Sequence, residues 1–253
     1  MSENNIMPLW KEKIKAFSIH LILSALVITL FLLIVMQFWY PGALFKLENV
    51  WQGLKILIPV DAILGPILTL ILFVPGKKGL KLDLSIIAVL QLSALIYGGF
   101  LIHQQRPIAL AFVIDRFETV LASEDYASNI SMGRFANEKN HNPLLTYVLP
   151  AQSEQERSQL LMSGISIKKQ PERHYPLSKY IDKLREASLS PESLTHVSSE
   201  ETEILKEFMQ KNHSQQDLLL LPVQGSTYKT IILVFDVKSL SVKRYLNVSP
   251  WKT

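Results

Sequence analysis

Three long apolar runs in the first part of the chain constrain its fold more than any other feature. They cover residues 19–38, 56–74 and 84–102. About 20 apolar residues in a helix cross roughly 30 Å of hydrocarbon, so each run predicts a transmembrane helix. Trp10 and Trp39 flank the first run and are typical of side chains anchored at the membrane interface. A signal peptide has a shorter apolar core of ~7–15 residues, so the first run predicts an anchor that is not cleaved.

The distribution of lysines predicts the orientation of these spans, because cytoplasmic loops are enriched in Lys and Arg. The loop 39–55 carries Lys46 and Lys55, and Arg106 follows the third span. Six lysines lie near the opposite ends of the spans: Lys11, Lys13, Lys15, Lys77, Lys78 and Lys81. This bias predicts a cytoplasmic N-terminus and a C-terminal region outside. The net charge of +4 thus reflects topology. No nucleic-acid motif accompanies it, so nucleic acid is not an expected partner.

The remaining residues predict a second domain, with boundaries at 1–104 for the transmembrane domain and 105–253 for the outer domain. About 150 residues are enough to enclose a small hydrophobic core. Ile108, Leu110, Phe112 and Ile114 alternate with other residues, which predicts a strand.

Further runs in the outer domain predict helices and an antiparallel meander. The helices are expected at 176–187 and 200–211, the second capped by Ser198 or Ser199, and the strands at 217–223, 228–237 and 241–248. Residues 123–143 and 150–172 are polar and aperiodic, and we expect them to be mostly loops. The predicted fold class is a membrane protein with three N-terminal transmembrane α-helices and a C-terminal extracytoplasmic α+β domain with an antiparallel sheet.

The second span contains a carboxylate, Asp61, and two prolines, Pro59 and Pro66. Pro59 suits the first turn of a helix, where its missing N–H costs nothing. Asp61 then lies about five residues into the span, roughly 8 Å deep, where it caps a slightly recessed helix.

Spacing offers a second interpretation of Asp61. Asp61, Gly65 and Thr69 recur every four residues, next to Pro66, and define one face that lets another helix approach closely. The third span has a comparable face with Gln91, Ala94 and Gly98, and Tyr97 lies alongside it. Because the two spans are antiparallel, Gln91 is expected near the depth of Thr69. Tyr97 is expected near Asp61 and to donate a hydrogen bond to it.

Three roles for the candidate face Asp61, Gly65, Pro66, Thr69, Gln91, Tyr97 and Gly98 follow, since an ionisable residue in a span is a functional candidate. Packing within the protein is favoured first. Contact with a partner's membrane helix comes second. Ion or proton translocation comes last, because a single carboxylate makes a poor pathway.

A second candidate region lies where the chain leaves the third span: Arg106, Pro107, Asp115, Arg116 and Glu118. "VIDRFETV" is expected to join the first outer strand to a short helix. One interpretation is a strand end with a local ion pair, worth ~1 kcal/mol or less. The other is a rigid junction that holds the outer domain against the bilayer at the membrane exit.

Signs of catalysis are missing from the sequence. The chain has no cysteine, and its six histidines show no pair at ligand spacing, so no metal site is expected. No nucleophile, phosphate-binding or dinucleotide motif is present. We therefore expect no catalytic residues, no cofactor and no enzymatic activity.

Three segments, "PVDAILGPILTLILF", "GLKLDLSIIAVLQLSALIYG" and "RPIALAFVIDRFETV", together resemble the type IV pilin accessory proteins, the TfpX/TfpZ group. The resemblance is clearest over about residues 10–125. The shared positions are Asp61, Gly65, Pro66, Asp83, Gln91, Arg106, Pro107, Asp115, Arg116 and Phe117.

The resemblance implies a multi-pass protein of the bacterial inner membrane, with its C-terminal domain in the periplasm, that supports or modulates type IV pilus assembly. Its implied partners are the major pilin, other pilus-assembly proteins and membrane lipid. It implies no catalytic residues. The pilin helix typically carries a carboxylate, which Asp61 would repel unless one of the two were protonated.

Two rival functions remain. A membrane-bound enzyme that modifies pilin or an envelope lipid is disfavoured by the missing catalytic motifs. A sensor is disfavoured because the expected cytoplasmic segments are short and contain no output domain.

Overall fold

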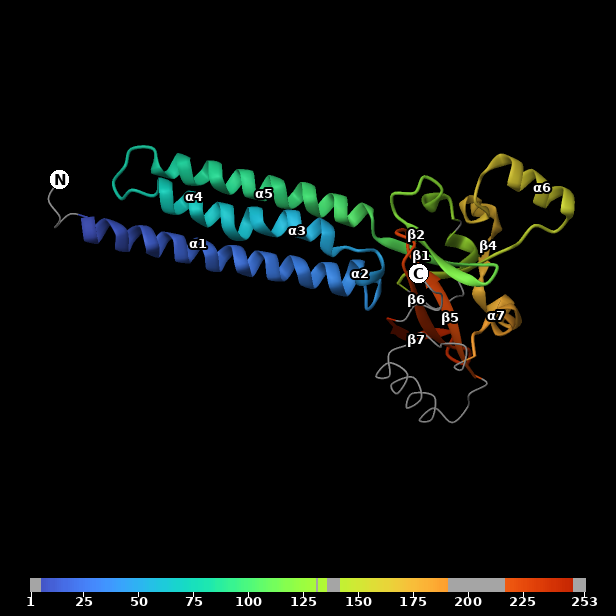
Figure 1. Cartoon of the computed structure of the whole chain (residues 1–253). Helices are drawn as coiled ribbons and strands as arrows, with labels where there is room; N and C mark the ends of the chain where they lie inside the picture. Colours follow the sequence, from blue (N-terminus) through green and yellow to red (C-terminus); the bar gives the residue numbers. More distant parts are fainter. Residues whose placement is uncertain (1–5, 131, 136–141, 191–216, 248–253) are drawn as a thin grey trace. The chain divides into compact units, whose positions relative to one another are not determined.

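The structure of the chain is a computed structural model that describes residues 6–130, 132–135, 142–190 and 217–247 (Figure 1). The chain divides into two compact units. Unit 1 consists of Met1–Trp39 and Val50–His103, and unit 2 consists of Tyr40–Asn49 and Gln104–Thr253.

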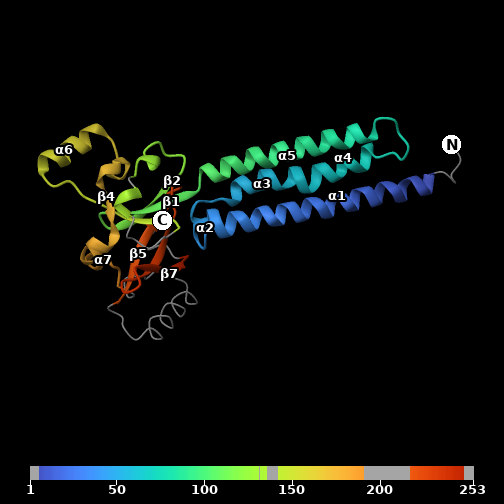
Figure 2. The ribbon, with the colours of Figure 1, turned by 180° about the vertical axis from the view of Figure 1, so that it is seen from behind.

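Unit 1 contains three long helical spans that run side by side (Figures 1 and 2). They are α1 (Ile6–Ile34) with a π-helical turn at Val35–Trp39, then α3 (Trp51–Pro59), a second π turn (Val60–Leu64) and α4 (Gly65–Leu72), and finally α5 (Leu80–Gln104). The segments Leu9–Trp39, Trp51–Leu72 and Leu80–Gln104 are each long and apolar enough to cross a membrane. The predicted three N-terminal apolar helices are confirmed.

The second span differs from its prediction in where it begins. It begins at Trp51, so Pro59 lies inside the helix and does not mark its first turn. Asp61 is ten residues from Trp51, roughly 15 Å along the axis at 1.5 Å per residue. The π turn explains how the helix continues past the prolines, because the Gly65 N–H bonds the Val60 carbonyl, five residues back. The predicted capping role of Asp61 is therefore wrong.

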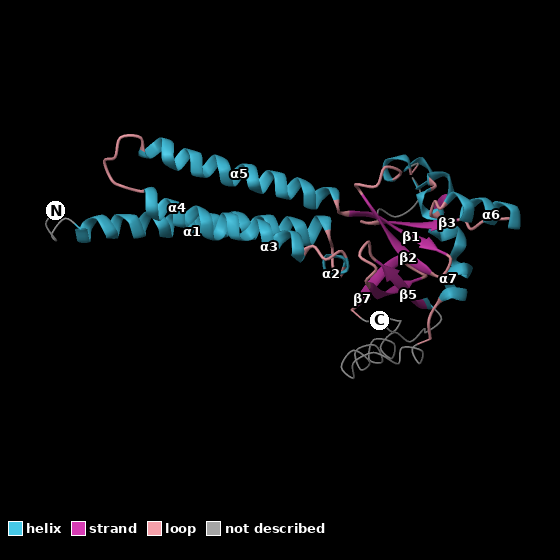
Figure 3. Cartoon of the chain, turned by 45° about the horizontal axis from the view of Figure 1, so that its top comes forward, coloured by secondary structure: helices cyan, strands magenta, loops and turns pink. Residues whose placement is uncertain are grey.

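Unit 2 is built on one seven-stranded sheet in the order β4-β3-β1-β2-β5-β6-β7 (Figure 3). The strands are β1 (Pro107–Val113), β2 (Arg116–Leu121), β3 (Leu144–Val148), β4 (His174–Pro176), β5 (Leu218–Gln224), β6 (Thr230–Asp236) and β7 (Ser241–Leu246). β1 pairs in parallel with β3, β2 pairs in parallel with β5, and the other pairs are antiparallel. The predicted α+β domain with its antiparallel β5–β6–β7 meander is confirmed.

The central strands are buried on both faces. Every residue from Leu218 to Val223 is buried, which fits the near-continuous apolar sequence of a central strand. The first strand was predicted from alternation, but Ala109 and Ala111 on its other face are as buried as Leu110 and Phe112.

Among the described residues of unit 2 the α-helices are short. They are α2 (Leu44–Leu47), α6 (Glu154–Ser163) and α7 (Ile181–Ala187), and a 3₁₀ turn at Leu177–Tyr180 leads into α7. The helix predicted at 176–187 is thus confirmed from Leu177 onward. The helix predicted at 200–211, with its cap at Ser198 or Ser199, lies outside the described residues.

The prediction that 150–172 is mostly loop misses α6. Ser153 caps α6 by accepting the Glu156 N–H (3.1 Å), and Gly164 ends it with a left-handed φ of 64°. No residue of α6 is buried, so the helix has no apolar stripe for a periodicity search to find.

The loop between the first two spans folds as part of unit 2. Leu44 and Leu47 are fully buried, and the hydroxyl of Thr227 donates to the Leu47 carbonyl (3.2 Å). The Glu48 carboxylate accepts the backbone N–H of Ser226 (3.3 Å). Residues 40–49 and the sheet domain therefore lie on the same side of any membrane that the spans cross.

Candidate functional site

The candidate face of the second span is buried inside unit 1. Asp61, Gly65, Pro66 and Thr69 are all buried, and Gln91 of α5 reaches across to them. A Cβ atom on Gly65 would lie 2.1 Å from Nε2 of Gln91, so the missing side chain at this position makes room for the Gln91 amide. Gln91, which was expected at the depth of Thr69, thus lies against Gly65.

His20 of α1, which was not among the predicted face residues, joins this face. The Gln91 amide donates to the backbone carbonyl of Asp61 (3.1 Å), and its oxygen accepts Nε2–H of His20 (2.9 Å). Because Nε2 carries the proton, the other ring nitrogen, Nδ1, accepts the hydroxyl proton of Thr69 (2.5 Å). His20 thus connects all three spans.

The predicted hydrogen bond between Tyr97 and Asp61 is wrong. Tyr97 is 66% exposed on the outside of α5. Asp61 is only 5% exposed, and neither of its carboxylate oxygens has a hydrogen-bond partner in the described part of the chain. Tyr97 misses Asp61 because the second span begins earlier than predicted, at Trp51, which changes which residues of the two spans lie opposite each other. Gln91, and not Tyr97, lies opposite Asp61. Gly98 packs against Leu57 of α3 and not against Asp61. A Cβ atom added to Gly98 would lie 2.7 Å from the Leu57 side chain.

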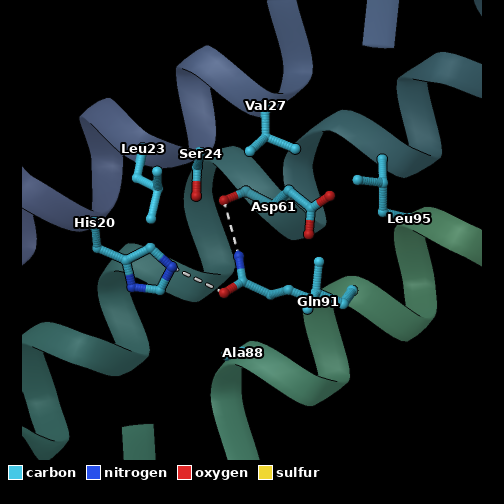
Figure 4. A pocket seen from close by; sticks show the side chains of 9 residues that line it. His20, Leu23, Ser24, Val27, Asp61, Ala88, Gln91 and Leu95 are labelled. Carbon is cyan, nitrogen blue, oxygen red and sulfur yellow. Dashed lines mark hydrogen bonds between the residues drawn. The ribbon is translucent and has the colours of Figure 1, made fainter. Parts of the chain in front are cut away.

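The Asp61 side chain borders a cavity of about 170 Å³ between α1 and α5 (Figure 4). Its carboxylate points into the space between the helices, on the side of Leu95. The wall is otherwise mostly apolar, formed by Leu23, Val27, Ala88, Leu92 and Leu95 with His20, Ser24 and Gln91. A nearly buried carboxylate without a partner is costly in such surroundings, which makes this cavity the candidate functional site.

The predicted membrane-exit residues do not form one cluster. Residues 114–115 form the turn of a hairpin between β1 and β2, so "VIDRFETV" leads into a strand and the expected short helix is wrong. Pro107 pairs with Leu121 at one end of this hairpin, whereas Arg116 pairs with Val113 at the other. At ~3.4 Å per residue the two ends are roughly 20 Å apart.

The charged members of this set have separate partners. Arg116 and Asp115 form the expected local ion pair (2.8 Å). Glu118 faces Lys168 instead (3.6 Å). The single rigid junction that the sequence suggested is therefore not formed by these residues.

Unit 2 contains a second buried histidine with both ring nitrogens occupied. Nε2–H of His174 donates to the Lys168 carbonyl (2.8 Å), and Nδ1 accepts the Thr146 hydroxyl (3.0 Å). Burial lowers the pKa of His174 below its ordinary value. These bonds indicate a core histidine. In the described ranges, no three His, Asp or Glu side chains come together to hold a metal ion.

Comparison with known proteins identifies relatives. A family model described as fimbrial assembly protein FimB matches residues 8–42. The chain is 24% identical over 247 residues, covering 94% of this chain and 96% of the relative, to the fimbrial assembly protein, serogroup I, of Dichelobacter nodosus. It is 36% identical over 103 residues to the fimbrial assembly protein, serogroups C1 and C2, of the same organism, covering 40% of this chain and 79% of the relative. No solved structure matches.

These matches confirm the resemblance to proteins connected with pilus assembly, drawn from the spans and the first strand. The chain belongs to the family of fimbrial assembly proteins.

Proposed function

We propose that this protein is an accessory factor of type IV pilus assembly in the bacterial inner membrane, acting by binding the pilin and not by catalysis. The observation that carries the proposal is the similarity to fimbrial assembly proteins over 94% of the chain. That range includes both units. A pilin presents an apolar helix to the bilayer and a globular head outside, so each unit has a part to contact.

In the membrane, the helices of unit 1 offer apolar faces to a partner helix. Ile96 and Tyr97 of α5 are 70% and 66% exposed, and Leu92 and Leu95 of the same helix line the cavity beside Asp61. Small and weakly polar residues in such faces favour helix association in lipid.

Outside the membrane, the tip of the β1–β2 hairpin and the end of α6 offer an apolar patch made of Ile114, Leu161 and Ile165. Leu161 is 77% exposed, Ile114 is 76% exposed and Ile165 is 50% exposed. Ile114 also has a φ of 61°, a left-handed conformation that is strained for a β-branched residue. Exposed apolar groups gathered around a hollow are typical of protein-binding surfaces, which supports a contact with the pilin head.

The proposed orientation has the N-terminus in the cytoplasm and unit 2 in the periplasm. The lysine bias supports it. A phosphatase fused after Thr253 should be active outside the cytoplasm. A reporter active only in the cytoplasm would contradict this orientation.

Deletion tests the role itself. We expect the deletion strain to lose surface pili and twitching motility, with recovery on complementation by the wild-type gene. Normal piliation and motility in the deletion strain would overturn the proposed function.

Site-directed crosslinking tests the outer contact. Because the chain has no cysteine, a photoreactive maleimide labels one introduced position at a time. Leu161→Cys should crosslink to pilin, whereas Tyr228→Cys, 83% exposed on the β5–β6 turn, should not. Equal crosslinking from both positions would indicate non-specific contact.

A further inference from the structure

A groove between α1 and α5 extends along unit 1. Two cavities, about 170 Å³ and about 520 Å³, share the residues His20, Leu23 and Ala88. The larger one reaches Glu12 and Lys15 near the start of α1, and the smaller one reaches Val27. From position 15 to position 27 the groove covers roughly 18 Å of helix at 1.5 Å per residue.

Asp61 is the unusual member of this groove. It lies near the middle of its span, ten residues from Trp51 and eleven from Leu72. Its side chain is nearly buried, with an exposed fraction of 5%, and both carboxylate oxygens are without a hydrogen-bond partner in the described residues. Removing a carboxylate from water without a partner costs several kcal/mol, so the native state retains this group at a substantial cost.

Three neighbouring side chains donate to acceptors other than the Asp61 carboxylate. The His20 imidazole donates to Gln91, the Gln91 amide donates to the Asp61 backbone carbonyl, and Thr69 donates to His20. These bonds hold the walls of the groove in place while the carboxylate stays directed into the cavity (Figure 4). They leave the carboxylate without a hydrogen-bond partner in the described residues.

We propose that the groove receives a transmembrane helix of a partner protein, and that the Asp61 carboxylate binds an amine carried by that helix. The apolar walls suit the side of such a helix, and an ammonium group on an alkyl stem is of a size to enter a cavity of about 170 Å³. A lipid chain also fits an apolar groove but brings no donor. Lipid amines lie in the headgroup region, roughly 15 Å from the level of Asp61.

The inference rests on the proposed function for its setting, a membrane that contains the pilus machinery, and the partner is defined by the amine that its helix carries at the level of Asp61. The pair of Asp61 with an amine adds a polar contact at a defined level in the membrane to a helix–helix contact otherwise made by apolar surfaces. The pairing of an amine with a carboxylate away from water is strong and directional, and it fixes the register of one helix against another.

Dicyclohexylcarbodiimide, which enters membranes, gives a direct test in membranes that contain the pilus machinery. It activates the Asp61 carboxyl group, and an amine in contact then attacks the activated carbon. An amide bond joins the two chains, and the carboxyl oxygen leaves in the urea. We expect a zero-length crosslink whose mass spectrum contains the peptide with Asp61.

Two variants should reduce the crosslink at least tenfold. Asp61→Asn removes the reacting group, and Leu95→Trp fills the cavity while keeping Asp61. Asp83→Asn is the matched control, because Asp83 lies at the start of α5, paired with Lys77 (2.6 Å), away from the cavity. Thermal unfolding in detergent checks that each variant is folded, and the Leu95 variant keeps the test valid if the Asp61 variant is not.

The outcomes separate the inference from the function. If Leu95→Cys photocrosslinks to a partner helix but no amide crosslink forms at Asp61, the proposed contact between Asp61 and an amine is overturned. A photocrosslink from Leu95→Cys to lipid only, together with loss of pili in the deletion strain, would overturn the groove as a helix site while the accessory role stands. Normal pili in the deletion strain would overturn the proposed function itself.

Discussion

The two units contain the same histidine arrangement in opposite settings. His20 and His174 each accept a threonine hydroxyl at Nδ1 and donate from Nε2 to an oxygen. In unit 2 that oxygen is a backbone carbonyl, and His174 is fully buried beside the sheet. In unit 1 it belongs to the Gln91 side chain, which also holds the backbone of Asp61 beside an open cavity.

The difference shows which polar residue points to function. Both ring nitrogens of each histidine are bonded inside the chain, as is usual for polar groups away from water. The carboxylate of Asp61 has no such explanation inside the chain, although it sits next to one of these histidines.

The largest effect is expected from Gly65→Ala in the bundle. The new Cβ would lie 2.1 Å from the Gln91 amide and 2.4 Å from its carbonyl carbon, so Gln91 must leave the position that binds His20 and Asp61. Overpacking and lost hydrogen bonds together should lower the free energy of unfolding by about 2–4 kcal/mol. Unfolding of the purified protein in mixed micelles, followed by tryptophan fluorescence, measures this.

The matched control for Gly65→Ala is Gly98→Ala. Its Cβ would meet only the end of the Leu57 side chain, at 2.7 Å, which can rotate away. Its cost should be clearly smaller than that of Gly65→Ala. Equal costs would mean that backbone crowding, and not the position of Gln91, limits the bundle.

A smaller effect is expected from Thr146→Val in unit 2. Valine keeps the shape of threonine but leaves Nδ1 of His174 buried without its donor. An unsatisfied buried acceptor costs about 1–3 kcal/mol, which should appear as a lower melting temperature of the full chain. Thr230→Val, at the partly buried start of β6, is the control and should change the melting temperature little. A neutral Thr146→Val would show that His174 finds another donor.

The pH dependence of stability should follow His174. Its pKa is lowered by burial in the folded state, whereas in the unfolded chain it titrates near 6.5. The neutral folded form thus contributes its full stability above about pH 6.5, and this is lost as the pH falls through the folded pKa. We expect the free energy of unfolding, derived from thermal melts, to fall by about 1 kcal/mol between pH 7 and pH 5.

The matched variant for this pH effect is His174→Gln, which replaces imidazole by a neutral amide. Its melting temperature should change less with pH over the same interval. A wild-type protein whose stability is flat from pH 7 to pH 5 would contradict the role given to His174.

Sequence patterns predicted the three spans and the β5–β6–β7 meander because both depend on long apolar runs. Hydrophobic runs identify buried or lipid-facing segments whatever the neighbouring elements do. The same reasoning missed α6, which packs no apolar face. Its signal was local, in the cap Ser153 and the terminal Gly164, and not periodic.

The candidate site was only half visible in the sequence. Spacing brought Asp61, Gly65 and Thr69 to one face and placed Gln91 opposite them. His20 was missed because it lies at the start of the apolar run, which begins at residue 19. The helical span begins ten residues earlier, at Leu9, so His20 lies well inside it. Tyr97 was misplaced for a related reason, since the start of the second span at Trp51 shifts every depth that was counted from residue 56.

The smallest effect is expected from Asp115→Asn at the hairpin tip. Asp115 is half exposed and pairs with its neighbour Arg116 (2.8 Å), which also donates to Gln224 (3.3 Å). An ion pair so open to solvent contributes less than about 1 kcal/mol, so the melting temperature should barely change. Pilus amount should also stay normal, because the hairpin ends hold Asp115 and Pro107 roughly 20 Å apart and no common junction exists. Loss of pili from a stable Asp115→Asn protein would instead make this tip part of the binding surface that includes Ile114.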